Sequence, residues 1–120
     1  MKRVLLAEDE DHIAKLIAFK LGREGFEVVC TSNGAEFLGQ VVQGKWALAI
    51  LDLMMPIMDG TEALRRLRTN ADYSDLPVLV LSAKGGAKEE AATLSLGANR
   101  FLRKPFDPVE LAKVVKEMTV

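Results

Sequence analysis

The sequence is poor in features that mark specialised classes of protein. Its single cysteine, Cys30, excludes an internal disulfide, and we expect it to be an inert residue of a covered strand. Its apolar runs, such as 47–51 and 77–81, are far shorter than the roughly 20 residues of a membrane-spanning helix. The net charge of −1 offers no basic surface for nucleic acid or an anionic membrane. We therefore expect a cytoplasmic domain that binds neither nucleic acid nor membrane directly.

The length and composition fit one globular domain that covers residues 1–120. Hydrophobic residues make up 49% of the chain and charged residues 28%, which is ordinary for a folded protein and unlike a disordered one. A chain of 120 residues is long enough to bury a hydrophobic core. No repeat, low-complexity tract or linker divides the sequence, so a single domain is expected.

Apolar runs of strand length alternate five times with segments of helical periodicity. Three of the runs are almost continuously apolar, which favours a parallel sheet covered on both faces. The alternation therefore predicts a doubly wound α/β fold, with a five-stranded parallel sheet and five helices on both of its faces. The predicted strands are 3–7, 27–31, 47–51, 78–82 and 99–102, and the predicted helices are 11–24, 34–43, 60–70, 87–96 and 107–118.

Charged residues follow three of the predicted strands at the point where each strand should end. Glu8, Asp9 and Glu10 follow the first strand, Asp52 the third and Lys104 the fifth. In open parallel sheets the binding crevice lies outside the carboxyl ends of the strands. Carboxylates that converge in a pocket of low dielectric repel one another unless a cation lies among them. A hard divalent cation is the simplest way to hold such acids together.

Four segments carry a resemblance that extends over essentially the whole chain: VLLAEDE at 4–10, DLMMPIMDG at 52–60, LSAKG at 81–85 and GANRFLRKPF at 97–106. In this order and spacing they resemble the response-regulator receiver domain, the phosphoacceptor module of two-component signalling. The resemblance implies a flavodoxin-like fold with strand order 2-1-3-4-5. It also implies a regulatory domain rather than an enzyme, catalysing only its own phosphoryl transfer and autodephosphorylation.

The resemblance implies a phosphoacceptor and a magnesium site at the ends of the first and third strands. Asp52 is the implied phosphoacceptor. Mg²⁺ would be held by Glu8, Asp9, Asp52 and the backbone carbonyl of Met54, an all-oxygen set of the kind that Mg²⁺ prefers. Glu8 stands where many relatives have aspartate, and we expect it to reach the metal through water, whereas Asp9 is expected to be a direct ligand.

Further positions match the phosphoryl-stabilising and switch residues of the family. The resemblance implies that Lys104 is the cation that neutralises the phosphoryl group and that the Lys104–Pro105 bond is cis. It also implies that Ser82 is the switch hydroxyl, which would donate a hydrogen bond to a phosphoryl oxygen. Phe101 matches the aromatic switch residue, although a plain core phenylalanine fits equally well because many relatives have tyrosine there.

The resemblance also implies regulation and partners. Met54 and Lys84 lie where the family tunes the lifetime of the acyl phosphate, and Gly85 and Gly86 give their loop unusual backbone freedom. The phosphodonor would be a histidine kinase or a histidine phosphotransfer protein. The output surface would comprise helix 87–96, strand 99–102 and the last helix, with an unknown downstream effector and room for a phosphorylation-dependent dimer.

Three alternatives fit less well. A magnesium-dependent phosphohydrolase would need a second acid two residues after Asp52, where this chain has Met54. A nucleotide-binding module would need a glycine-rich turn after the first strand, where residues 8–11 are all acidic. A receiver that folds but is not phosphorylated is the third, although all the key side chains are present.

Overall fold

The computed structural model describes residues 1–83 and 86–120, and its elements follow the predicted alternation. No boundary differs by more than two residues from the prediction, and within the described ranges the short 3₁₀ helix η1, Ala71–Tyr73, is the one element that the sequence pattern does not predict. The strands are β1 Lys2–Ala7, β2 Phe26–Thr31, β3 Leu48–Asp52, β4 Val78–Ser82 and β5 Arg100–Arg103. The helices are α1 Asp11–Arg23, α2 Gly34–Val41, α3 Gly60–Thr69, α4 Ala87–Ser95 and α5 Pro108–Met118.

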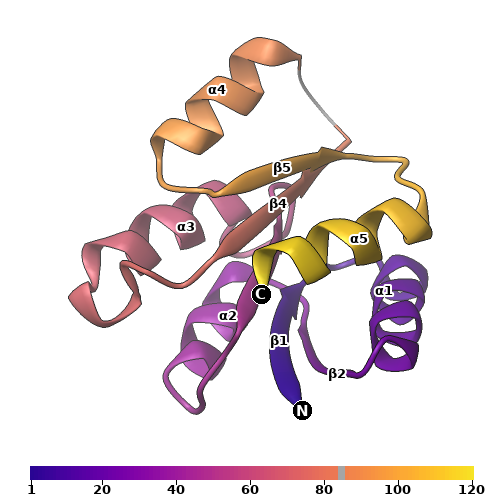
Figure 1. Ribbon diagram of the computed structural model, residues 1–120. Helices are drawn as coiled ribbons and strands as arrows, with labels where there is room; N and C mark the ends of the chain where they lie inside the picture. The colour runs from indigo at the N-terminus through magenta and orange to yellow at the C-terminus, as the bar shows by residue number, and fades with distance from the viewer. Residues whose placement is uncertain (84–85) are drawn as a thin grey trace.

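The five strands form one parallel sheet in the order β2-β1-β3-β4-β5, which confirms the expected topology. Figure 1 shows the strands running through the middle of the molecule with helices on both sides. Strand order reverses direction at β1 and β3, so the carboxyl ends of these two neighbours flank the switch point of the sheet.

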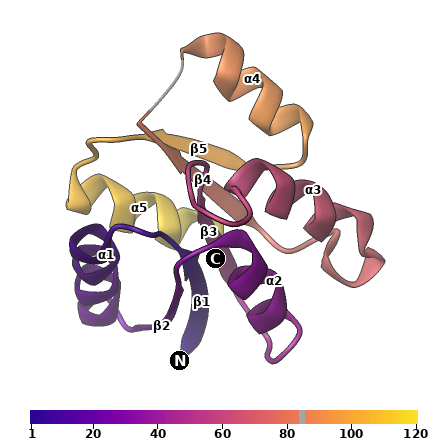
Figure 2. The same ribbon diagram turned by 180° about the vertical axis from the view of Figure 1, so that it is seen from behind.

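Each face of the sheet has its own hydrophobic core because successive residues of a strand point to opposite faces. Val4 and Leu6 of β1 belong to the core that includes buried residues of α1 and α5. Leu5 and Ala7 belong to the core that includes buried residues of α2 and α3. Figures 1 and 2 show α1 and α5 on one side of the sheet, α2 and α3 on the other, and α4 beside β5.

The prediction that Cys30 lies in a covered strand is wrong. Strand β2 is an edge strand, and Cys30 is exposed there. Residues of an edge strand pair on one side only and can be left uncovered by the flanking helices, which the apolar composition of residues 26–31 does not reveal.

The helix termini nearest the carboxyl edge of the sheet are defined by their own side chains. Asp59 caps α3 by accepting a hydrogen bond from the Glu62 backbone N–H at 2.9 Å. Gly60 begins α3 so close to β3 that an added Cβ would lie 2.2 Å from the Asp52 carbonyl oxygen. Only glycine therefore allows α3 to start directly beside the end of β3.

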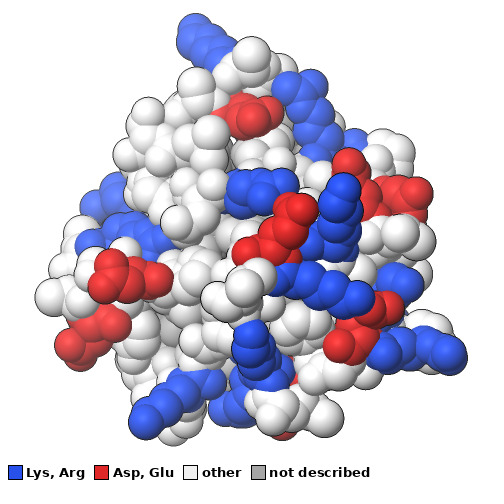
Figure 3. Space-filling view, in the orientation of Figure 1, with Lys and Arg blue, Asp and Glu red and all other residues white. Residues whose placement is uncertain are grey.

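No helix within residues 1–83 and 86–120 has the length and apolarity needed to cross a membrane. On the face shown in Figure 3, basic and acidic side chains are interspersed rather than gathered into one large patch. This mixed surface agrees with the net charge of −1.

Candidate functional site

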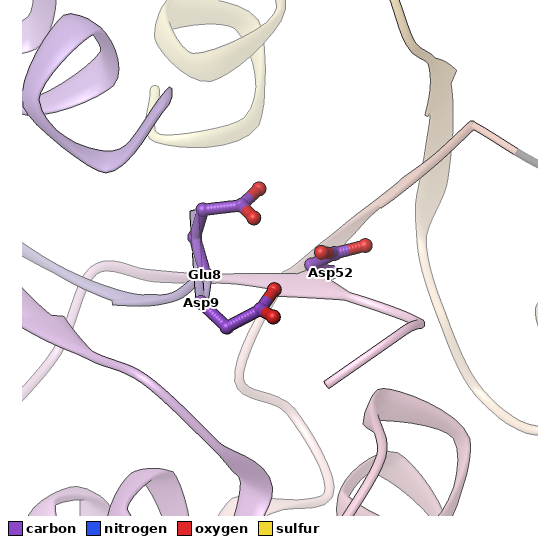
Figure 4. Close-up of side chains that lie close together, drawn as sticks. All are labelled: Glu8, Asp9 and Asp52. Carbon is purple, nitrogen blue, oxygen red and sulfur yellow. The ribbon is translucent and has the colours of Figure 1, made fainter. Parts of the chain in front are cut away.

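Three carboxylates from two adjacent strand ends share one space. Glu8 and Asp9 follow β1, and Asp52 is the last residue of β3, which pairs directly with β1. One carboxylate oxygen of each residue lies within 4.8 Å of those of the other two. Figure 4 shows the three side chains turned toward the same region. The predicted convergence of acids at the switch point is therefore present.

Lys104 supplies a cation to two of these acids. Its Nζ lies 2.7 Å from Glu8 Oε1 and 3.2 Å from Asp52 Oδ2. Lys104 follows β5, which is separated from β3 by β4, so the long side chain has to cross the end of β4 to reach Asp52. The Lys104–Pro105 peptide bond is cis, the isomer that the resemblance implies. The Lys104 backbone N–H donates to the Ser82 carbonyl at 2.9 Å, which fixes this segment to β4.

Burial controls the electrostatics of the ion-paired residues. The Glu8 side chain is fully buried, and that burial, with the Asp52 charge, raises the pKa of Glu8 to about 7 although Lys104 opposes the shift. Glu8 Oε1 receives no hydrogen bond of regular geometry from the described residues, and its contact is the ion pair with Lys104. Burial also acts to lower the pKa of Lys104, but the hydrogen bond to Glu8 and the Asp52 charge raise it overall.

The site opens into a cavity of about 780 Å³. Asp9, Asp52 and Lys104 line it, as the sequence led us to expect. Three further polar residues that sequence reasoning missed also line it: Asp59, Thr61 and Glu89. Asp59 could have been found as the helix cap before Gly60, whereas the approach of Glu89 depends on where α4 lies and has no local signal.

The loop between β3 and α3 holds an unusual backbone conformation beside this cavity. Ile57 has a φ of 69°, and the Met58 N–H donates across it to the Pro56 carbonyl at 2.7 Å, which closes a γ-turn. The Met58 carbonyl in turn accepts from the Gly34 N–H at 2.8 Å. The loop is thereby fixed to α2, and the side chain of Ile57 is left 85% exposed.

The remaining predicted site residues lie near the pocket to different degrees. Ser82 is buried at the end of β4, next in the sheet to β3. Met54 lines the cavity, and its backbone N–H donates to Asp52 Oδ1 at 3.3 Å. Phe101 is half-buried and packs against the core on the α2 and α3 side. Lys84 and Gly85 lie outside the described residues.

The donor set fits a hard divalent cation. Glu8, Asp9 and Asp52 offer only carboxylate oxygens, and two of the three residues are buried. Among the described residues on the wall of the cavity, Lys104 is the single cationic one, and it cannot neutralise all three acids. Mg²⁺ prefers oxygen ligands and keeps several of its waters, so these residues suit it.

Comparison with known proteins assigns the family. A family model of the response regulator receiver domain matches residues 4–116. The chain is 38% identical over 108 residues to the uncharacterized transcriptional regulatory protein YkoG of Bacillus subtilis, covering 90% of this chain and 46% of that protein. It is 36% identical over 118 residues to the transcriptional regulatory protein PcoR of Escherichia coli, covering 98% and 51%. The chain thus spans about half the length of these curated relatives.

Solved structures of receiver domains have the same fold. The Francisella response regulator 1452 receiver domain superposes with a TM-score of 0.93 at 29% identity, covering 99% of this chain and 97% of that one. The chemotaxis response regulator CheY4 of Vibrio cholerae gives a TM-score of 0.93 at 28% identity, covering 98% of each chain. Such domains are regulatory phosphoacceptors rather than enzymes in the usual sense. The chain belongs to the response regulator receiver family of two-component systems.

Proposed function

We propose that this chain is a single cytoplasmic receiver domain that accepts a phosphoryl group on Asp52 and thereby changes the surface formed by α4, β5 and α5. The observation that carries the proposal is the position of Asp52. It is a buried carboxylate at the end of a central strand, 3.2 Å from a lysine ammonium and open to a cavity that a phosphodonor can enter.

In the proposed reaction a carboxylate oxygen of Asp52 attacks phosphorus. The bond between phosphorus and an imidazole nitrogen of the donor breaks, and the new oxygen–phosphorus bond makes an acyl phosphate. Because the transition state is loose and its charge spreads over the phosphoryl oxygens, catalysis is mainly positioning and electrostatic stabilisation. Lys104 provides one positive charge beside Asp52 from the position it already holds.

Mg²⁺ would be held by Asp9, Asp52, the backbone carbonyl of Met54 and, through water, Glu8. When bound, it supplies positive charge that screens the acids from one another and from the incoming phosphoryl oxygens. The chain's own contribution is to hold Asp9 and Asp52 on adjacent strand ends, so little rearrangement of the backbone is required.

The proposed switch uses residues already linked across the sheet. A phosphoryl group on Asp52 would compete with Glu8 for Lys104, because that ammonium contacts both carboxylates. The Ser82 hydroxyl would donate a hydrogen bond to a phosphoryl oxygen. The hydrogen bond from the Lys104 N–H to the Ser82 carbonyl would then transmit movement from β4 to β5. Phe101, half-buried on β5, would then repack.

The upstream partner in this proposal is a histidine kinase or histidine phosphotransfer protein, and the downstream partner is an effector that contacts α4, β5 and α5. Met54 and Lys84 would set the lifetime of the acyl phosphate. A phosphorylation-dependent dimer through the same surface is compatible with the exposed Leu94 and Leu96 around the end of α4.

The test is incubation with acetyl phosphate and Mg²⁺ followed by intact mass and peptide mapping. We expect one phosphoryl adduct, on Asp52, that disappears in Asp52→Asn and when Mg²⁺ is chelated. Asp59→Asn is the matched control, because Asp59 lines the same cavity and asparagine retains the cap of α3. An adduct that persists in Asp52→Asn, or one that is lost equally in Asp59→Asn, would show that the acceptor is wrongly assigned.

A further inference from the structure

Helix α4 contributes an acid to the cavity in addition to the acids at the strand ends. Glu89, in the first turn of α4, is half-buried and lines the same cavity as Asp52. The helix itself is weakly anchored, since Thr93 is its only buried residue among those described. The Thr93 hydroxyl donates to the Glu89 carbonyl at 2.9 Å, so the buried turn of α4 is tied directly to the residue that reaches the cavity.

Glu89 adds to an excess of negative charge around Asp52. Among the described residues that line the cavity, Lys104 is the only cation, and Glu8 and Asp52 already share it. No ion pair of the Glu89 carboxylate is found within residues 1–83 and 86–120. The next residue, Glu90, differs in both respects, because it does not line the cavity and its carboxylate lies 3.7 Å from an Arg103 guanidinium nitrogen.

We propose that Glu89 is a specificity-determining residue whose charge disfavours the entry of highly anionic phosphodonors into the Asp52 cavity. This inference rests on the proposed function of Asp52. A phosphodonor must bring its negative charge past Glu89, and charge lining a cleft with walls of low dielectric alters the rate at which ions enter it. The penalty grows with the charge of the donor. It falls as salt screens the carboxylate.

Glu89→Gln and Glu90→Gln form a matched pair for the test. Each removes one negative charge from the same turn, so the change in net charge and in the interaction with the α4 dipole is the same. The rate of Asp52 phosphorylation is measured by intact mass, at saturating Mg²⁺, with acetyl phosphate, a dianion at neutral pH, and with phosphoramidate, which carries one net negative charge.

With acetyl phosphate at low ionic strength we expect Glu89→Gln to react about three to ten times faster than the wild type and Glu90→Gln to match the wild type. The gain should be smaller with phosphoramidate and should shrink as salt is added. Equal rates for the two variants, or an equal gain with both donors, would overturn the role of Glu89 and leave the function of Asp52 intact. A wild-type protein that is never labelled on Asp52 would overturn the proposed function and this inference with it.

Discussion

Glu8 and Asp52 share one ammonium at the centre of the site, and each carboxylate also accepts one backbone hydrogen bond. The Glu10 N–H donates to Glu8 Oε2 at 3.2 Å and the Met54 N–H donates to Asp52 Oδ1 at 3.3 Å, while Lys104 contacts the other oxygen of each acid. The Glu8 side chain is fully buried beside a second acid, and Lys104 and the Glu10 N–H offset the cost of ionising it only in part, so the pKa of Glu8 rises to about 7. The charge state of Glu8 therefore couples the stability of the metal-free protein to pH.

We expect the free energy of unfolding of the metal-free protein to fall as pH rises from about 4.5 to about 7. Below this window the Glu8 carboxyl is protonated in both the folded and the unfolded protein. Within the window the folded protein keeps the Glu8 proton whereas the unfolded chain releases it, so a rising pH favours the unfolded chain. The loss of stability is complete once the pH has passed the folded pKa of about 7. Urea denaturation in the presence of a chelator measures the slope. Glu8→Gln should flatten it, and an unchanged slope in that variant would contradict the assignment.

Ile57 is the second residue whose conformation is costly. A β-branched side chain at a φ of 69° is strained, and the exposed side chain recovers little energy from packing. Ile57→Asn should therefore stabilise the protein by about 1 kcal/mol, because asparagine, unlike a β-branched residue, is enriched at positive φ. Val42→Asn, at an exposed position with a φ of −79°, is the control and should bring no such gain in urea denaturation.

Among the secondary-structure elements, α3 is tied to the turn between α4 and β5 by one side chain. The Arg68 guanidinium donates twice to the Gly97 carbonyl, at 3.0 and 2.8 Å, and also to the Tyr73 carbonyl at 2.6 Å. It donates to Asn99 Oδ1 at 3.1 Å as well, and that oxygen also accepts from the Val78 N–H. Arg68 thus holds the carboxyl-terminal end of α4 in place while the rest of that helix is weakly anchored.

Arg68→Met should lower the free energy of unfolding by about 2 kcal/mol, because it leaves part-buried carbonyls without their donor. Hydrogen exchange of residues 96–100 should speed up more than exchange in α1. Arg65→Met is the control, since Arg65 is exposed and pairs only with Glu62 in the described part of the chain. For Arg65→Met we expect the free energy of unfolding to change by less than about 0.5 kcal/mol. Similar losses in both variants would contradict the proposed role of Arg68 in holding the end of α4.

In the whole molecule the two ends of the sheet have different roles. The carboxyl end carries the acids and Lys104, whereas Trp46 lies just before β3 at the opposite end. Along the strand, Trp46 is about 20 Å from Asp52, at roughly 3.3 Å per residue. Its indole N–H donates to the Val41 carbonyl at 3.0 Å, and the Arg3 guanidinium lies 4.4 Å from the ring centroid. Trp46 should therefore report unfolding of the whole domain and respond little to ligands at the site.

Mg²⁺ should stabilise the folded protein by mass action, by about 2.7 kcal/mol at a concentration one hundred times its Kd. Urea denaturation followed by Trp46 fluorescence measures this stabilisation. Asp9→Asn should abolish most of it because Asp9 is expected to be a direct ligand. Asp72→Asn should retain it, because Asp72 lines a separate cavity to which the three acids of the site do not contribute. Equal stabilisation of both variants by Mg²⁺ would show that the metal binds elsewhere.

Local patterns in the sequence were sufficient for the elements and for the chemical nature of the site. Periodicity located every strand and the five α-helices within two residues, because alternation of apolar residues reflects which faces of an element are buried. The acids at 8–10 and Asp52 could be assigned to strand ends for the same reason. The order of the strands and the individual roles came from the resemblance to the receiver family, not from periodicity.

Only the tertiary structure decided which side chains meet. It brought Lys104 across the end of β4 to pair with both Glu8 and Asp52, and it placed Glu89 of α4 in their cavity. It also left Cys30 exposed by placing β2 at the edge. These contacts join residues far apart in the chain, and they depend on how strands are ordered side by side and where helices pack against them. The sequence by itself determined the elements and the charges at their ends. The order of the strands in the sheet and the packing of the helices against it determined burial, ion pairing and the shape of the cavity.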